Sequence, residues 1–170
     1  MNQQRITGWL REFGSEYAVP NEVQALVDSG VIEDTSWHND ACPTFEAYNE
    51  HGYRLRMGVD CPDAEQREFP DAARFNVWLY DEDDNEEYPY SGDNLQDALL
   101  AILKTLGNLA LRFEDDATDP DPDYTAINKF GNIAEQLMSS ASAEKWNRYC
   151  LKATTAEIVS SAINFIKEGN

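Results

Sequence analysis

Two imidazoles and two thiols, the side chains that most often bind zinc, occur within 24 residues, at His38, Cys42, His51 and Cys61. Familiar zinc sites bring their ligands in close pairs, roughly two to five residues apart. Only His38 and Cys42 have that spacing. The pattern therefore does not favour a zinc site, and we expect neither a metal nor a cofactor.

Cys42 also offers a nucleophile that either histidine could deprotonate. A reactive thiol needs a lowered pKa, which cationic neighbours provide. The nearby charged residues are instead anionic, at Asp34, Asp40 and Glu46, and negative charge raises the pKa of a thiol. A small enzyme with a thiol site, or with a carboxylate pair, is therefore kept only as an alternative. Carboxylates are too numerous here for any one pair to stand out.

An acidic stretch that begins at Asp81 invites a calcium interpretation, because Asp81, Asp83 and Asn85 match the first three ligand positions of an EF-hand loop. Such a loop needs glycine at its sixth position and a bidentate glutamate at its twelfth. Those positions hold Glu86 and Gly92. The spacing therefore favours an acidic hairpin turn over an EF-hand.

Carboxylates are concentrated in two stretches, residues 81–87 and 114–123, each with six acidic side chains and no Lys or Arg. The second stretch contains prolines and is predicted to be a solvated linker, in which alternating carboxylates could bind a cation weakly. Both stretches are candidate partner-binding surfaces. Their carboxylates are Asp81, Glu82, Asp83, Asp84, Glu86, Glu87, Glu114, Asp115, Asp116, Asp119, Asp121 and Asp123.

The charge is strongly unbalanced along the chain. Overall, 32 acidic and 13 basic residues give a formal net charge of −19. Residues 1–128 carry 28 acidic and 8 basic side chains, a net of −20, whereas residues 129–170 carry 4 and 5, a net of +1. Lys and Arg are absent from residues 12–53, 75–103 and 113–128. Because phosphate contacts need these side chains, we do not expect direct nucleic-acid binding.

An anionic surface of this kind attracts basic surfaces. Proteins that hold nucleic acid present such surfaces, and B-DNA itself carries one charge per roughly 1.7 Å of axis. The charge pattern therefore predicts a non-enzymatic inhibitor that mimics nucleic acid and blocks a basic protein or nucleoprotein complex. Anti-restriction and anti-CRISPR proteins of phages and plasmids follow this logic, which is an analogy of class only. The alternative is that the acidity serves only solubility.

A second binding hypothesis is an immunity or antidote protein for a basic toxin nuclease. It draws on a predicted sheet face that carries aromatic and arginine side chains, which are typical anchors of protein interfaces. We expect the C-terminal helices to cover this face, with exposure as the alternative. Its residues are Tyr48, Arg54, Arg56, Arg74, Trp78 and Tyr80.

Alternation of apolar and polar residues predicts an antiparallel sheet in the middle of the chain. Thr44–Glu50 and Tyr53–Asp60 flank a tight turn at His51-Gly52, and Ala73–Asp81 is the clearest strand. Glu86–Tyr90 can pair back as a short edge strand. We therefore expect an α+β fold with a three- to four-stranded antiparallel meander.

Helical periodicity predicts two short helices near the N-terminus, the second capped by Asn21 and ended by Gly30. A long packed helix begins after a capping box at Asp93 and runs to about Phe113. Three segments result: an acidic α+β core over 1–113, a linker over 114–123, and a helical C-terminal segment over 124–170. The apolar stripes of the last segment need a cover, which leaves a homodimer open.

The chain shows neither an apolar run long enough to span a membrane nor a secretory signal at its start. Its three cysteines are widely spaced and odd in number, so reduced thiols are the simpler interpretation. We therefore expect a cytoplasmic protein with no membrane partner.

Overall fold

The computed structural model describes residues 8–49 and 51–114 and, beyond them, six single residues: Gly131, Ala134, Glu135, Trp146, Ser161 and Ala162. The side chains of residues 110–114 are not among the described parts. The chain divides into two compact units, Met1–Leu99 and Leu100–Asn170. The predicted linker, apart from Glu114, lies outside the described residues, so its boundaries stay a prediction.

The first unit contains a five-stranded antiparallel sheet whose strands follow one another in chain order. The α+β class is confirmed, but the sheet has one strand more than the three or four expected. The extra strand has only two residues, too few to show an alternating pattern. The strands are β1 Glu33–Asp34, β2 Thr44–Tyr48, β3 Arg54–Val59, β4 Phe75–Tyr80 and β5 Glu86–Gly92.

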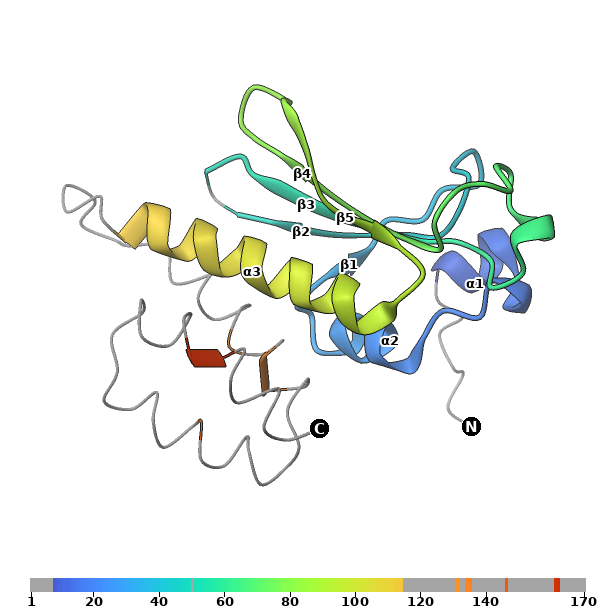
Figure 1. Ribbon diagram of the computed structural model, residues 1–170, viewed down its shortest axis with the longest axis horizontal. Helices are drawn as coiled ribbons and strands as arrows, with labels where there is room; N and C mark the ends of the chain where they lie inside the picture. The colour runs from blue at the N-terminus through green and yellow to red at the C-terminus, as the bar shows by residue number, and fades with distance from the viewer. Residues whose placement is uncertain are drawn as a thin grey trace. The chain divides into compact units, whose positions relative to one another are not determined.

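Helices precede and follow the sheet in the chain (Figure 1). As predicted, Gly30 ends α2. It has a left-handed φ of 74°, and the N–H of the next residue, Val31, donates to the Leu26 carbonyl in the last turn of the helix. The helices are α1 Gly8–Phe13, the 3-10 turns η1 Ser15–Tyr17 and η2 Ala64–Gln66, α2 Asn21–Asp28 and α3 Leu95–Glu114.

Both predicted N-terminal caps were wrong. Pro20, not Asn21, is the N-cap of α2, and no side chain caps that helix. The Asn94 side chain accepts from the Asp97 N–H (3.2 Å) at the start of α3. Asp93 instead accepts from the Arg74 N–H (2.7 Å), a contact between residues 19 apart that no local pattern reveals.

Alternation along the strands separates a buried face from an open one. The register aligns Phe45 with Met57 and Met57 with Val77, and all three are buried. The open face carries Arg56, which pairs across the sheet with Glu46 on one side and Trp78 on the other. The predicted alternation is confirmed for β3 and β4, whereas in β2 Thr44 and Glu46 are buried as well.

The second unit includes residues 100–114 of α3. Between residues 100 and 109, whose side chains are described, the buried apolar residues include Ile102, Leu103, Leu106 and Leu109. The six described residues after position 114 are all helical, and three of them, Ala134, Trp146 and Ala162, are buried. The rest of the predicted C-terminal helices lies outside the described residues. In the described part of the chain, no helix has both the length and the apolar character needed to cross a membrane.

Candidate functional site

The turn between β4 and β5 is acidic and exposed, and Figure 1 shows this hairpin extending away from the rest of the sheet at the top of the view. Asp81 supports the turn from within. Its carboxylate accepts from the backbone N–H groups of Asp83 (3.0 Å) and Asn85 (2.9 Å). Asp84 adopts a left-handed conformation with a φ of 59°. Asp81 is therefore a turn residue, and the remaining carboxylates face solvent: Glu82, Asp83, Asp84, Glu86 and Glu87.

A basic side chain of β3 contacts this turn. Arg54 Nη2 lies 3.8 Å from Asp84 Oδ1, but the Asp84 side chain is largely exposed, and such pairs are weak. Gly52, in the turn between β2 and β3, lies next to Glu82, where a Cβ on the glycine would be 3.3 Å from the Glu82 Cβ. Residues 8–49 and 51–114 hold no cluster of three or more His, Cys, Asp or Glu that could bind a metal ion.

Most of the predicted aromatic and arginine face is assembled on the open side of β2, β3 and β4. The register aligns Tyr48 with Arg54 and Arg54 with Tyr80. The Arg54 guanidinium lies over the Tyr80 ring, 4.2 Å from its centroid, in cation–π geometry. Tyr48 is 46% exposed. The expectation that the C-terminal helices cover this face falls on residues outside the described part.

Arg74 lies apart from this group. It precedes β4, and its Nη2 donates to the Ala18 carbonyl (3.1 Å). Its guanidinium lies 4.9 Å from the centroid of the Phe75 ring. Alternation placed Arg74 with Trp78 and Tyr80, but the residue belongs to the end of the sheet that meets the N-terminal segment.

A pocket of about 210 Å³ opens on the same face. The loop after β1 folds back over the sheet, where the Ser36 hydroxyl accepts from the Thr44 N–H (3.1 Å) and Asp40 Oδ2 accepts from the Thr44 hydroxyl (3.2 Å). The loop thereby forms one wall of the pocket, and the sheet forms the other. The pocket is lined by Asp40, Ala41, Cys42, Thr44, Arg56, Trp78 and Tyr80.

Gly58 makes room for the indole ring that lines this pocket. A Cβ at this position would lie 3.0 Å from two ring atoms of Trp78 and 3.1 Å from the Cys42 Sγ, both closer than ordinary contacts. The missing side chain therefore lets Trp78 lie across β3.

Arg56 is held by two carboxylates. Its Nη2 lies 3.2 Å from Asp40 Oδ2, and its Nε lies 3.6 Å from Glu46 Oε1. Glu46 is buried and also accepts from the Tyr48 hydroxyl. This hydrogen bond, with burial and the Glu46 charge, raises the pKa of Tyr48 to about 12. Arg56 thus lies between two carboxylates, and the second arginine of this face, Arg54, lies over the pocket-lining Tyr80.

The Cys42 thiol is buried, which raises its pKa to about 12, and the charges of Asp60 and Asp40 act in the same direction. The predicted direction is confirmed, although burial is the largest cause. At neutral pH the thiol is protonated, which disfavours nucleophilic attack. The ring of His38 packs against Trp37, and its Nδ1 lies 3.9 Å from Glu12 Oε2.

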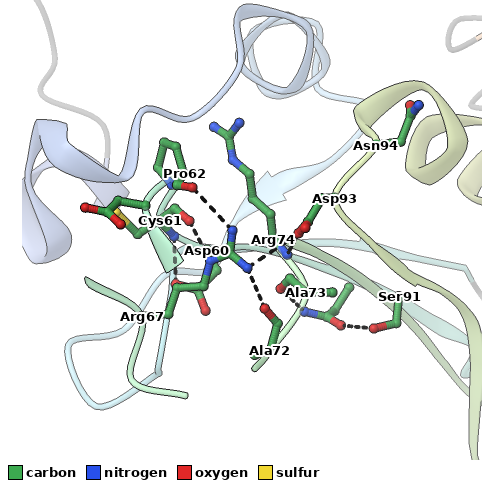
Figure 2. A network of polar contacts seen from close by, with 12 residues as sticks. Asp60, Cys61, Pro62, Arg67, Ala72, Ala73, Arg74, Ser91, Asp93 and Asn94 are labelled. Carbon is green, nitrogen blue, oxygen red and sulfur yellow. Dashed lines mark hydrogen bonds and ion pairs between the residues drawn. The ribbon is translucent and has the colours of Figure 1, made fainter. Parts of the chain in front are cut away.

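A buried arginine network joins the loop before β4 to the sheet, and the sequence patterns did not predict it (Figure 2). The Arg67 guanidinium donates to the backbone carbonyls of Cys61 (2.8 Å), Pro62 (3.4 Å) and Ala72. It also lies 3.4 Å from Asp93 Oδ1. The sequence gives only a weak signal for this network, namely that Arg67 is the one basic residue between positions 57 and 73. These contacts identify Arg67 as a structural residue.

Asp60 is buried beside this network, and its Oδ1 accepts from the Cys61 N–H (2.7 Å). Burial raises the pKa of Asp60, and the Cys61 hydrogen bond and the Arg67 charge oppose that shift only in part. A raised folded-state pKa means that the folded protein binds the proton more tightly than the unfolded chain does. The destabilising contribution of the charged form is therefore absent below the unfolded pKa, about 3.9. It is fully present above the folded pKa.

An Asp60→Asn variant should show this dependence, because an amide oxygen can keep the Cys61 hydrogen bond without a charge. We expect the unfolding free energy of the variant, relative to the unsubstituted protein, to rise as pH increases from about 4 to about 7. Urea titrations at both pH values measure this difference, with the exposed Asp71→Asn as control. A difference that does not change with pH would contradict the assignment.

Five of the predicted linker carboxylates, Asp115, Asp116, Asp119, Asp121 and Asp123, lie outside the described residues, as does the side chain of Glu114. No family model, curated protein or solved structure matches the chain.

Proposed function

We propose that this protein is a non-enzymatic inhibitor that binds a basic, nucleic-acid-binding partner and blocks its nucleic-acid site. The observation that carries the proposal is the acidic turn between β4 and β5. Glu82, Asp83 and Asp84 are exposed in the turn, and Glu86 and Glu87 are exposed at the start of β5, while the Asp81 carboxylate is used inside the turn. No Lys or Arg lies near them in the sequence, from residue 75 to residue 103, although Arg54 of β3 pairs with Asp84.

The proposal has a physical basis in self-repulsion. Like charges held close together destabilise a folded chain, and the Arg54–Asp84 ion pair at the turn is exposed and therefore weak. A cationic partner would relieve that repulsion on binding. The same field would speed the encounter, because electrostatic steering raises association rates at low salt.

An immunity protein for a basic toxin nuclease is the second candidate. The pocket beside Trp78 and the partly exposed face around Tyr48 and Arg54 favour it. Such features recognise a partner by shape, so a single substitution among them would remove most of the binding. A nucleic-acid mimic would instead lose binding gradually as carboxylates are neutralised.

Neutralising the turn tests the proposal. The test variant combines Glu82→Gln, Asp83→Asn, Asp84→Asn and Glu87→Gln and leaves Asp81 intact, because Asp81 supports the turn. The control removes four exposed carboxylates elsewhere, by Glu22→Gln, Glu65→Gln, Glu68→Gln and Asp71→Asn. Both variants therefore have the same net charge.

The immobilised protein first captures its partner from a nuclease-treated lysate of the cells in which it acts. The purified partner is then bound to a fluorescent nucleic acid, and displacement by each variant is measured at two salt concentrations. We expect the turn variant to associate about tenfold more slowly than the control variant at low salt. Equal displacement by both variants, or a captured partner that binds no nucleic acid, would overturn the proposal.

A further inference from the structure

We infer that residues 8–18 form a strap that opens from the end of the sheet as a unit while the sheet stays folded, and that this opening exposes the buried thiol of Cys61. The strap consists of α1, η1, the glycine between them and Ala18. Its contacts lie at the end of the sheet opposite the β4–β5 turn (Figure 1). The inference goes beyond the proposed function and does not rest on it.

The side chains of the strap are exposed or only partly buried. None of residues 8–18 is buried, whereas α2, which follows, buries Val23 and Leu26 almost completely. The rings of Phe13 and Tyr17 pack against each other within the strap, with centroids 5.1 Å apart. A segment with few buried apolar contacts opens at a lower free energy than the core of a protein does.

At its N-terminal end the strap is attached through side chains. The Trp9 N–H donates to Asp34 Oδ2 (2.9 Å), and the Trp9 indole N–H donates to Gln24 Oε1 (3.0 Å). No described backbone–backbone hydrogen bond joins residues 8–18 to the sheet. These contacts can therefore be exchanged for hydrogen bonds to water without breaking the pairing of any strand.

At its C-terminal end the strap is also attached through side chains, and its backbone is strained. The Arg74 guanidinium donates to the Ala18 carbonyl (3.1 Å), and the Tyr17 hydroxyl donates to the Ala41 carbonyl (3.4 Å). Figure 2 shows the Arg74 side chain extending away from the Arg67 network. Ala18 has a φ of 44°, a left-handed conformation that is unfavourable for a residue with a Cβ. Opening releases this strain, which favours the open form.

The strap covers the Cys61 thiol. Cys61 is 2% exposed, and its Sγ lies 3.7 Å from the Glu16 carbonyl oxygen in the strap and 3.7 Å from Gln66 Oε1 in η2. Opening of the strap removes the first of these neighbours and leaves the second in place. Because the strap supplies part of the cover of the thiol, the reactivity of the thiol reports the opening.

Hydrogen exchange of the whole protein, followed by NMR, tests whether the strap opens without the sheet. The Trp9 amide reports the strap, because its hydrogen bond to Asp34 must break on opening. Relative to intrinsic rates, we expect this amide to exchange about 100-fold faster than the amides within β3 and β4. Urea below the unfolding transition should hardly change its rate but should raise the rates in β3 and β4 steeply, because only global unfolding exposes a large surface.

Alkylation of Cys61 tests whether the strap opens as a unit. Iodoacetamide reacts with the native protein, and mass spectrometry of the proteolysed product identifies the peptide that contains Cys61. Tyr17→Phe removes the hydrogen bond to Ala41 and should raise the alkylation rate of Cys61 about threefold. Tyr88→Phe is the matched control, since it removes a hydroxyl from an exposed tyrosine of β5 and should leave the rate unchanged.

Three results would each overturn the inference. The first is a Trp9 amide as well protected as the amides of β3 and β4. The second is alkylation of Cys61 only at the rate of global unfolding, because the thiol would then be exposed by loss of the sheet. The third is an equal alkylation rate in Tyr17→Phe and Tyr88→Phe, because η1 would then not control access to the thiol. None of these measurements involves a partner, so their outcome leaves the proposed function unaffected.

Discussion

Arg67→Ala is expected to lower the free energy of unfolding by about 3 kcal/mol. Arg67 is buried, and its guanidinium donates to three backbone carbonyls in the loop before β4 (Figure 2). Alanine would leave those carbonyls without a protein donor and would remove the positive charge near buried Asp60. The loop would therefore have to rearrange or admit water.

Urea unfolding followed by far-UV circular dichroism measures this loss. Arg67→Lys should also be destabilised, because a single ammonium cannot reproduce the fork that reaches Cys61, Pro62 and Ala72 at once. Arg11→Ala is the control, since Arg11 is largely exposed and pairs with adjacent Glu12. An Arg67→Ala protein as stable as the control would show that the network does not support the fold.

Phe75→Ala should cost about 3–5 kcal/mol, the usual range for removing a buried aromatic ring. Phe75 is 1% exposed and pairs with Val59 on β3 and Gly92 on β5. Its loss would leave a cavity at the buried face of the sheet. Because many domains have only about 5–15 kcal/mol of stability, a loss of this size removes a large part of what keeps the protein folded.

Phe69→Ala is the matched control, because Phe69 is 61% exposed and the same atoms are removed from solvent-exposed surface. Phe75→Leu gives a milder variant if the alanine protein does not fold, and its loss should be smaller. Equal chemical denaturation midpoints for Phe69→Ala and Phe75→Ala would contradict the assignment of Phe75 to the core.

The turn and the aromatic and arginine face would contribute differently to binding a basic partner. Exposed carboxylates act at a distance and are screened by salt, so they mainly affect how fast the partner arrives. The face acts at contact and would mainly affect how slowly the partner leaves. Salt should therefore change the association rate more than the dissociation rate.

Local patterns in the sequence identified the main strands and the acidic turn. Alternation placed Arg56 and Trp78 on one face and Met57 and Val77 on the other, as the register confirms. It succeeded because neighbouring side chains of a strand point to opposite faces, which needs no knowledge of distant residues. The helix α3 was predictable for the same reason, since its apolar stripe repeats within the segment itself.

Only the tertiary structure decided the rest. Three features depend on residues that are distant in the sequence or lie in an irregular loop. They are the position of Asp40 over the sheet, the contact of Arg74 with Ala18 and the burial of Arg67. Such contacts carry no periodic signal, because the path of an irregular loop depends on the carbonyl and carboxylate groups that it contacts in the folded protein. The acidic turn was therefore visible in the sequence, whereas the pocket beside it appeared only once the chain had folded.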